Sequence, residues 1–166
     1  MNLKETLKFY GITSIWHFTD KSNLDSIKEH GLLSLRLLSQ QNIDVSCYGA
    51  DSLSHSLDRN KGIDKYVHLS IIKDHPMLYI KKRNGDIPNP IWLEIEVSVL
   101  FEKESLCCNQ IANKNGASCY NIDKIAEVID LEKLLNKPAL TDPIKRSQLL
   151  VANNIEWNKI KGVHHG

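Results

Sequence analysis

The sequence lacks a long apolar run, an excess of charge of either sign and a cysteine pair at metal-binding spacing. No stretch approaches the ~18 consecutive apolar residues that a membrane-spanning helix needs, so no membrane association is expected. Twenty-one lysines and arginines against twenty aspartates and glutamates leave a formal charge of +1. This balance gives no general evidence for nucleic-acid binding, which would therefore have to come from a local patch.

The cysteines also carry no C-x-x-C spacing. Cys107 and Cys108 are adjacent, which is poor geometry for either a disulfide or a zinc site. The N-terminal residues have the spacing of a surface helix, broken by charges, and not that of a secretion signal. We therefore expect a cytoplasmic protein with reduced thiols and no bound metal. The four cysteines are Cys47, Cys107, Cys108 and Cys119.

No repeat, low-complexity tract or linker divides the 166 residues. One domain covering residues 1–166 is expected, large enough to bury about two-thirds of the surface of its unfolded chain. The apolar spacing and the turn residues predict a mixed α+β order of elements. The predicted strands are 15–18, 66–72, 77–81, 91–100 and 149–151, and the predicted helices are the N-terminal segment ended by Gly11, the segment from Ser22 to Gly31, and much of 121–135.

The stretch 14–34 is the most informative part of the chain. Its apolar strand, Ile15 to Phe18, holds His17 on a rigid element, where the ring is a good hydrogen-bonding group for a ligand. Ser22 is expected to cap the following helix, and Gly31, which can adopt a positive φ, to end it. A lone histidine on an apolar strand is more often a packed core residue, so the functional interpretation depends on the surrounding block.

Other acidic residues have simpler interpretations. Glu94 and Glu96 share one face of the predicted strand 91–100, which could make an acid and base pair, although a solvated strand face explains them without chemistry. Several aspartates near histidines lie in the polar tract 39–65 without the spacing of metal ligands. That tract is too long for a plain connection, and loops of more than about 12 to 15 residues are usually functional.

Four blocks follow one another in order over nearly the whole chain. They are 15–19 (IWHFT) with 23–24 (NL) and 31–34 (GLLS), then 62–70 (GIDKYVHLS) with 75–77 (HPM), then 115–118 (NGAS), and finally 146–151 (RSQLLV). Together they resemble the DarT group of NAD-dependent ADP-ribosyltransferase toxins, which modify bases of single-stranded DNA. The resemblance implies a split mixed β-sheet flanked by helices, with NAD as the substrate in a cleft between two half-sheets.

The resemblance also implies site residues. His17 and Thr19 would contact NAD at the adenosine-side ribose or hold its nicotinamide end, and Tyr66 would wall the nicotinamide pocket. Arg59 would meet the pyrophosphate, because a planar guanidinium suits a diphosphate, and it is counted among the catalytic residues as well. The tract 39–65 would fold over the cofactor. The remaining residues expected at the cofactor are Asn23, Gly31 and Leu32.

Gln148 departs from the family pattern, which has its catalytic glutamate at this position. A carboxylate would stabilise the oxocarbenium ion formed as nicotinamide leaves and help to take a proton from the base, whereas glutamine keeps a hydrogen bond and loses the charge. Three explanations stay open: an inactivating substitution, a natural variant that uses other groups, or a shifted register. The activity of the chain as printed is therefore expected to be impaired.

The acceptor implied by the resemblance is a thymine or guanine base of single-stranded DNA. Two local basic patches could follow a phosphate backbone, and Tyr79 or Trp92 could stack a base. A macrodomain-type antitoxin is an implied partner, and a monomer is expected. Two alternatives remain: a catalytically silent NAD- or nucleic-acid-binding homologue, and transfer to RNA or protein. The basic residues are Lys81, Lys82, Arg83, Lys145 and Arg146.

Overall fold

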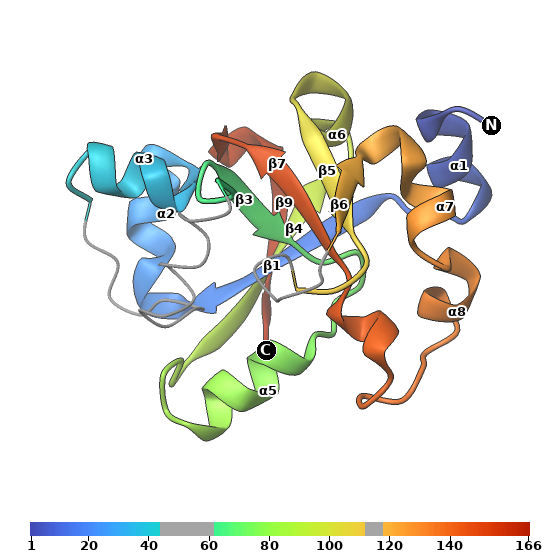
Figure 1. Ribbon diagram of the computed structural model, residues 1–166. Coiled ribbons are helices and arrows are strands. Elements are labelled where there is room, and N and C mark those ends of the chain that lie inside the picture. The colour runs from blue at the N-terminus through green and yellow to red at the C-terminus, as the bar shows by residue number, and fades with distance from the viewer. Residues whose placement is uncertain (44–61, 112–117) are drawn as a thin grey trace.

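The computed structural model describes residues 1–43, 62–111 and 118–166 (Figure 1). The strands are β1 (Ser14–Asp20), β2 (Leu32–Leu33), β3 (Tyr66–Leu69), β4 (Pro90–Glu96), β5 (Ser105–Cys108), β6 (Cys119–Asn121), β7 (Gln148–Ala152), β8 (Asn154–Ile155) and β9 (Ile160–His165). The α-helices are α1 (Leu3–Phe9), α2 (Leu24–His30), α3 (Leu35–Gln40), α5 (Pro76–Arg83), α6 (Val99–Glu102), α7 (Ile125–Val128) and α8 (Leu131–Leu135). Short 3-10 helices are η1 (Lys21–Asn23), η2 (Ile122–Lys124), η3 (Pro143–Arg146) and η4 (Trp157–Lys159). The α+β class expected from the sequence is confirmed.

The described strands form three sheets in which every pairing is antiparallel. The first has the order β1-β4-β9, the second β3-β7-β5-β6, and a short third pairs β2 with β8. A single β-bridge between Trp16 and Ser70 joins the first two sheets. In Figure 1, α2 and α3 lie on one side of these sheets and α1, α7 and α8 on the other.

The core lies against the inner faces of the two larger sheets. Alternation along β1 and β4 puts Ile15, Leu93 and Ile95 on one face, and all three are fully buried. Leu149 and Val151 of β7 belong to the same cluster of buried residues. The alternate residues of β4, Glu94 and Glu96, lie on the other face and are half-buried. The alternation of side chains along these strands therefore determines which face of each sheet is buried in the core.

The predicted helix after β1 exists, but Ser22 does not cap it. The Asp20 carboxylate accepts from the Ser22 backbone N at 2.9 Å and from its hydroxyl at 2.6 Å, so the turn η1 begins one residue earlier and leads into α2. A carboxylate is as good a cap as a hydroxyl. Gly31 ends α2 at φ +82°, and a Cβ there would stand 2.9 Å from the Ile155 carbonyl oxygen.

The strand predicted over 77–81 is wrong, because this segment is the helix α5. The His75 ring nitrogen Nδ1 accepts from the Met77 backbone N at 3.1 Å, and Pro76 occupies the first turn, where its missing N–H costs nothing. His75 is therefore a buried helix cap. The run Met77 to Ile80 is too short for periodicity to distinguish a helix from a strand.

The last strand, β9, contains His164 and His165. It pairs with β4, and the His164 Nε2 atom lies 3.0 Å from Glu94 Oε1. The long predicted strand over 91–100 ends at Glu96, since Val99 begins α6. The strand predicted over 66–72 likewise ends at Leu69.

The expectation of reduced thiols is contradicted by a disulfide between Cys108 and Cys119. These residues are directly opposite in the β5–β6 pairing, with their Cα atoms 4.3 Å apart. Directly opposed positions bring two Cβ atoms close enough for a bridge, and the sequence separation does not reveal that pairing. Cys107 points to the other face as a free, buried thiol, and burial raises its pKa to about 11.

The disulfide closes a loop of 11 residues in sequence and should stabilise the oxidised protein. We predict that Cys119→Ser lowers the free energy of unfolding by about 2 to 3 kcal/mol without reductant, because the unfolded chain regains loop entropy. Urea unfolding with and without reductant measures this difference, which should vanish once wild type is reduced. Alkylation of Cys108 in the untreated native protein would contradict the bridge.

Burial lowers the pKa of His75 to about 4. Between that value and the ordinary value of 6.5 the unfolded chain binds a proton that the native chain refuses, so stability falls as pH drops through this window. Asparagine keeps a cap acceptor and does not titrate, so His75→Asn should reduce the loss between pH 7 and about pH 4.5 by up to about 3 kcal/mol. Urea unfolding at both pH values tests this. An unchanged pH dependence would mean that His75 titrates normally.

Candidate functional site

The two larger sheets diverge directly after their bridge. The backbones of Trp16 and Ser70 exchange hydrogen bonds of 2.8 and 2.7 Å, which makes them a hydrogen-bonded antiparallel pair. In a continued ladder the next such pair would join Phe18 to His68. Instead, the ring nitrogen Nδ1 of His17 lies 2.8 Å from the His68 carbonyl oxygen. The side chain takes the acceptor that the next rung would use, and the sheets separate there.

This contact also determines the tautomer of His17. A carbonyl oxygen accepts and cannot donate, so Nδ1 carries the hydrogen and Nε2 carries a lone pair. Burial lowers the pKa of His17 to about 4, more than the hydrogen bond to His68 raises it. At neutral pH the ring is uncharged, and its Nε2 is suited to accept from a hydroxyl such as those of a ribose.

Two polar residues that follow His17 in the sequence, Thr19 and Asn23, are hydrogen-bonded to each other. Thr19 lies two residues after His17, on the same face of β1, and its hydroxyl accepts from the Asn23 amide nitrogen at 3.1 Å. Both residues are buried. Gly31 and Leu32 follow α2; Leu32 pairs with Ile155 in the core. Packing alone explains Gly31 and Leu32. Their expected contact with the cofactor stays a prediction.

One face of the four-stranded sheet carries Gln148, and we call it the Gln148 face. Paired residues on neighbouring strands point to the same side. Gln148, half-buried at the start of β7, is opposite Cys108, and the next residue on this face, Leu150, is opposite His68. Gln148 therefore lies two residues along β7 from the strand position that contacts His17. The members of the face on β3, β7, β5 and β6 are Tyr66, His68, Gln148, Leu150, Ala152, Leu106, Cys108, Cys119 and Asn121.

Tyr66 is held at the far end of the same face. It pairs with Ala152, whose small side chain leaves room for the Tyr66 hydroxyl to donate to Glu104 Oε1 at 2.7 Å. Burial, with the hydrogen bond and charge of Glu104, raises the pKa of Tyr66 to about 12. The hydroxyl is therefore protonated at any physiological pH and the ring is fixed in position.

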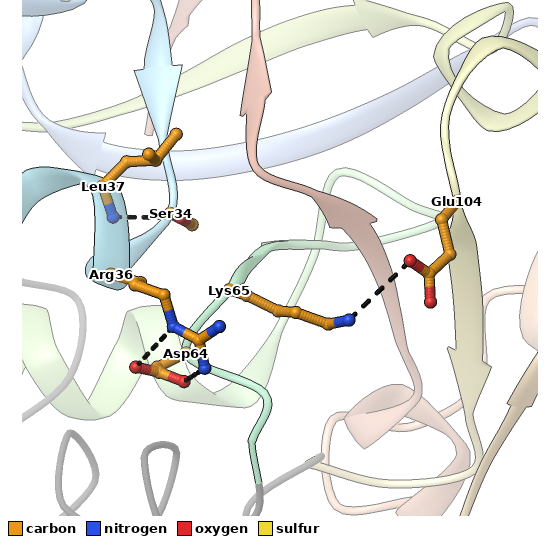
Figure 2. Close-up of polar contacts among 6 residues, drawn as sticks. All are labelled: Ser34, Arg36, Leu37, Asp64, Lys65 and Glu104. Carbon is orange, nitrogen blue, oxygen red and sulfur yellow. Dashed lines mark hydrogen bonds and ion pairs between the residues drawn. The ribbon is translucent and has the colours of Figure 1, made fainter.

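Figure 2 shows how the residues before Tyr66 are anchored. Asp64 accepts from the Arg36 guanidinium at 2.8 Å, and the Asp64 carbonyl oxygen accepts from the Arg36 backbone N at 2.9 Å. Lys65 lies 3.8 Å from Glu104 across the sheet. Arg36 belongs to α3, whose first turn Ser34 caps through the Leu37 backbone N. These contacts tie α3 and β5 to the segment that enters β3.

Glu94 and Glu96, which the sequence suggested as a possible acid and base pair, lie on the opposite face of β4 from His17. Glu94 accepts from Ser14 at 2.6 Å and lies 3.0 Å from His164, on the face of β4 opposite to His17, and these bonds lower its pKa. Glu96 shares that face. Glu104 instead extends the Gln148 face, but it lies opposite Ala152, about 13 Å along the strands from Gln148. The Ser-Leu-Cys-Cys segment after Glu104 has no alternation that could have revealed this strand.

The expected basic contacts divide into buried and exposed groups. Lys145 is buried and its ammonium pairs with Asp74, while Lys81 is buried with its ammonium 3.7 Å from Asp86. A buried, paired ammonium is poorly placed for a phosphate, and the expected DNA contact of these two lysines stays a prediction. Lys82 and Arg83 are exposed at the end of α5, and Arg146 is half-buried.

Some expectations concern parts of the chain outside the described residues. Arg59 and most of the tract 39–65 lie there. Within residues 1–43, 62–111 and 118–166, no three histidine, cysteine, aspartate or glutamate side chains lie together as a metal site would need. No helix in the same ranges is long and apolar enough to cross a membrane.

The comparisons agree with one another on family and fold. The family model described as "ssDNA thymidine ADP-ribosyltransferase, DarT" matches residues 16–165. No curated protein matches the sequence. The DarT of Thermus sp. 2.9 in complex with ADP-ribosylated ssDNA has a similar structure, with a TM-score of 0.73 and 16% identity over 92% of this chain and 81% of that chain. A complex of the same Thermus protein with NAD+ has a TM-score of 0.66 and 15% identity, with the same coverage of both chains, 92% and 81%.

A longer protein has a similar fold. The Thermosipho africanus DarTG in complex with ADP-ribose gives a TM-score of 0.70 and 19% identity, over 91% of this chain and 43% of that chain. At these identities the solved structures establish the fold, and the family model, which spans most of the chain, establishes the family. The chain belongs to the DarT family of ssDNA thymidine ADP-ribosyltransferases.

Proposed function

We propose that this protein binds NAD at the divergence of its two larger sheets and transfers ADP-ribose to a thymidine base of single-stranded DNA. The observation that carries the proposal is the neutral, oriented His17 at the divergence of the sheets. It contacts His68, whose pairing partner Leu150 lies two residues along β7 from Gln148. The family description supplies the reaction class. The complexes of Thermus DarT with NAD+ and with ADP-ribosylated ssDNA support both substrates.

In this proposal, residues of β1 and η1 bind the ribose and the rest of the cofactor. His17 Nε2 accepts from a ribose hydroxyl, and Thr19 with Asn23 contributes hydroxyl and amide groups beside it. Tyr66, locked by Glu104, walls the nicotinamide side. Arg59 supplies a guanidinium to the pyrophosphate, as the family resemblance implies. The backbones of Gly31 and Leu32 close the same side.

The reaction breaks the bond between nicotinamide and its ribose, which leaves positive charge on that ribose. A carboxylate at position 148 would stabilise this charge and help to remove a proton from the acceptor base. Gln148 can donate or accept a hydrogen bond but carries no charge. The chain as printed is therefore an impaired transferase that retains its NAD site. The same substitution favours a second candidate function, a silent NAD- or DNA-binding homologue.

We further propose that the active form is the toxin of a toxin–antitoxin pair, acting in the cytoplasm as a monomer. ADP-ribose on template bases would block replication. A macrodomain-type antitoxin that removes the modification is the partner expected for such a toxin. The proposal for the pair rests on the family and on the DarTG relative.

The decisive prediction concerns Gln148. Glutamate is nearly isosteric with glutamine, so Gln148→Glu should keep the fold and raise the rate of ADP-ribose transfer by about 10²- to 10³-fold, since one electrostatic partner of a developing charge is worth that much. The measurement is mass spectrometry of single-stranded oligonucleotides after incubation with NAD, with thymidine or another base as the single possible acceptor.

Gln148→Ala serves as the matched control, since it removes the amide and introduces no charge. A folded, NAD-binding Gln148→Glu protein that modifies no oligonucleotide would sink the assignment of position 148 or of DNA as acceptor. Modification of RNA or protein alone would redirect the acceptor. Full activity in the printed chain would show that another group carries the charge.

A second prediction isolates NAD binding from turnover. His17→Ala should weaken NAD binding about tenfold, since one hydrogen bond to a ribose hydroxyl contributes on the order of 1 kcal/mol. Calorimetric titration with NAD measures this. His30→Ala is the control, because His30 is exposed at the end of α2 and should leave binding unchanged. Absence of any heat or thermal stabilisation of wild type at millimolar NAD would overturn the cofactor assignment.

A further inference from the structure

A cavity of about 190 Å³ lies between α5 and the outer face of β4, on the opposite side of β4 from His17. Its lining residues include Leu78, Tyr79 and Lys82 of α5, Trp92 of β4, and Lys73 before α5. Figure 1 shows α5 beside the end of the chain, and Asp74, His165 and Gly166 complete the lining. We expected Lys82, Tyr79 and Trp92 to contact DNA, and this cavity brings the three residues together.

The lining combines aromatic surface with exposed cations. Trp92 is buried beneath it, with its ring 5.4 Å from that of Phe18, so it forms a rigid apolar floor. Tyr79 is half-exposed at 50%, although it is a large aromatic residue on a short helix. Lys73 and Lys82 are both exposed. An aromatic ring flanked by flexible cations matches one base together with its phosphate.

The acidic residue in the cavity does not cancel this charge. Asp74 lines the cavity, but its carboxylate pairs with the buried ammonium of Lys145. The two charges of this pair offset each other, so among the side chains that line the cavity Lys73 and Lys82 supply the positive charge. Single-stranded DNA carries one negative charge per nucleotide, and neutralising even two phosphates makes binding depend on salt.

The ion pair of Asp74 and Lys145 also connects the cavity to the segment that precedes Gln148. Lys145 lies in η3, which ends at Arg146, two residues before Gln148. Asp74 immediately precedes the cap of α5. Arg146 is close enough to His75 for its charge to contribute to lowering that pKa. A strand with its acceptor base at Gln148 can therefore pass Arg146 and reach α5.

We propose that this cavity is a subsite for a nucleotide that flanks the acceptor base, with the base against Tyr79 and its phosphate between Lys73 and Lys82. This inference rests on the proposed function, since it concerns the same DNA substrate. A cavity of this size has room for one base and not for a base pair. The subsite therefore selects an unpaired strand at a position remote from the chemistry.

The test uses a short, fluorescein-labelled single strand with one thymidine, and fluorescence anisotropy at several salt concentrations. Tyr79→Ala should weaken binding at least fivefold, because stacking of one base on an aromatic ring is worth that much. Lys82→Ala should weaken binding and lower the slope of log affinity against log salt by about 0.7. Phe9→Ala and Lys8→Ala are the matched controls, since both residues are exposed on α1, away from α5.

Abasic substitutions at each position around the thymidine locate the subsite. At one flanking position, loss of the base should weaken wild type as much as Tyr79→Ala does, and should cost Tyr79→Ala nothing more. Equal losses in the α5 and α1 variants, or additive losses at every abasic position, would overturn the subsite while DNA binding stands. A wild type that binds NAD and no single strand would overturn the proposed DNA acceptor and the subsite with it.

Discussion

The fold depends on one hydrogen bond that a side chain takes from a backbone ladder. His17 Nδ1 donates to the His68 carbonyl oxygen, which faces β1 and would otherwise accept from the next rung after the Trp16–Ser70 bridge. A buried carbonyl without a donor is costly, so two strands that separate need a substitute at the point of divergence. Histidine provides it and keeps a second nitrogen. In the proposed function, the residue that permits the two sheets to separate is therefore also the residue that contacts NAD.

The two faces of the sheets differ in how much apolar surface they bury and in how their polar groups are held. Inner residues such as Ile15, Leu93 and Val151 hold the sheets together through ordinary apolar burial. The Gln148 face has a smaller cluster of buried residues, Ile63, Tyr66, Cys108, Leu150 and Ala152. Its polar groups are fixed by contacts across strands, as Tyr66 is by Glu104. Groups held by rigid strands keep their geometry without a ligand, which reduces the entropic cost of binding.

The sequence predicted the parts of the fold whose information is local. Ile15 and Phe18 marked β1 because apolar and β-branched residues bounded by polar ones favour a strand, and His17 came with it. Local information was insufficient at Met77, where apolar residues suit either period, and at the start of α2, where Asp20 caps the turn in place of the expected Ser22. It could not reveal Cys108 opposite Cys119 or Glu104 beside Tyr66, because register between strands determines both. The sequence likewise does not reveal that Lys145 pairs with Asp74, which lies 71 positions earlier in the chain.

Position 148 shows how fold and chemistry can be separated within one strand. Its neighbours along the row are the sulfur atoms of Cys108 and Cys119, and a disulfide offers no hydrogen to donate to a carboxylate. A glutamate in such a place would receive no hydrogen bond from that disulfide. Folding, in turn, gains nothing from a charge there, because the strand is held by Leu149, Leu150 and Val151 in the core. Glutamine at this position is therefore compatible with an intact fold, while in the proposed function it lacks the carboxylate that the transfer would use.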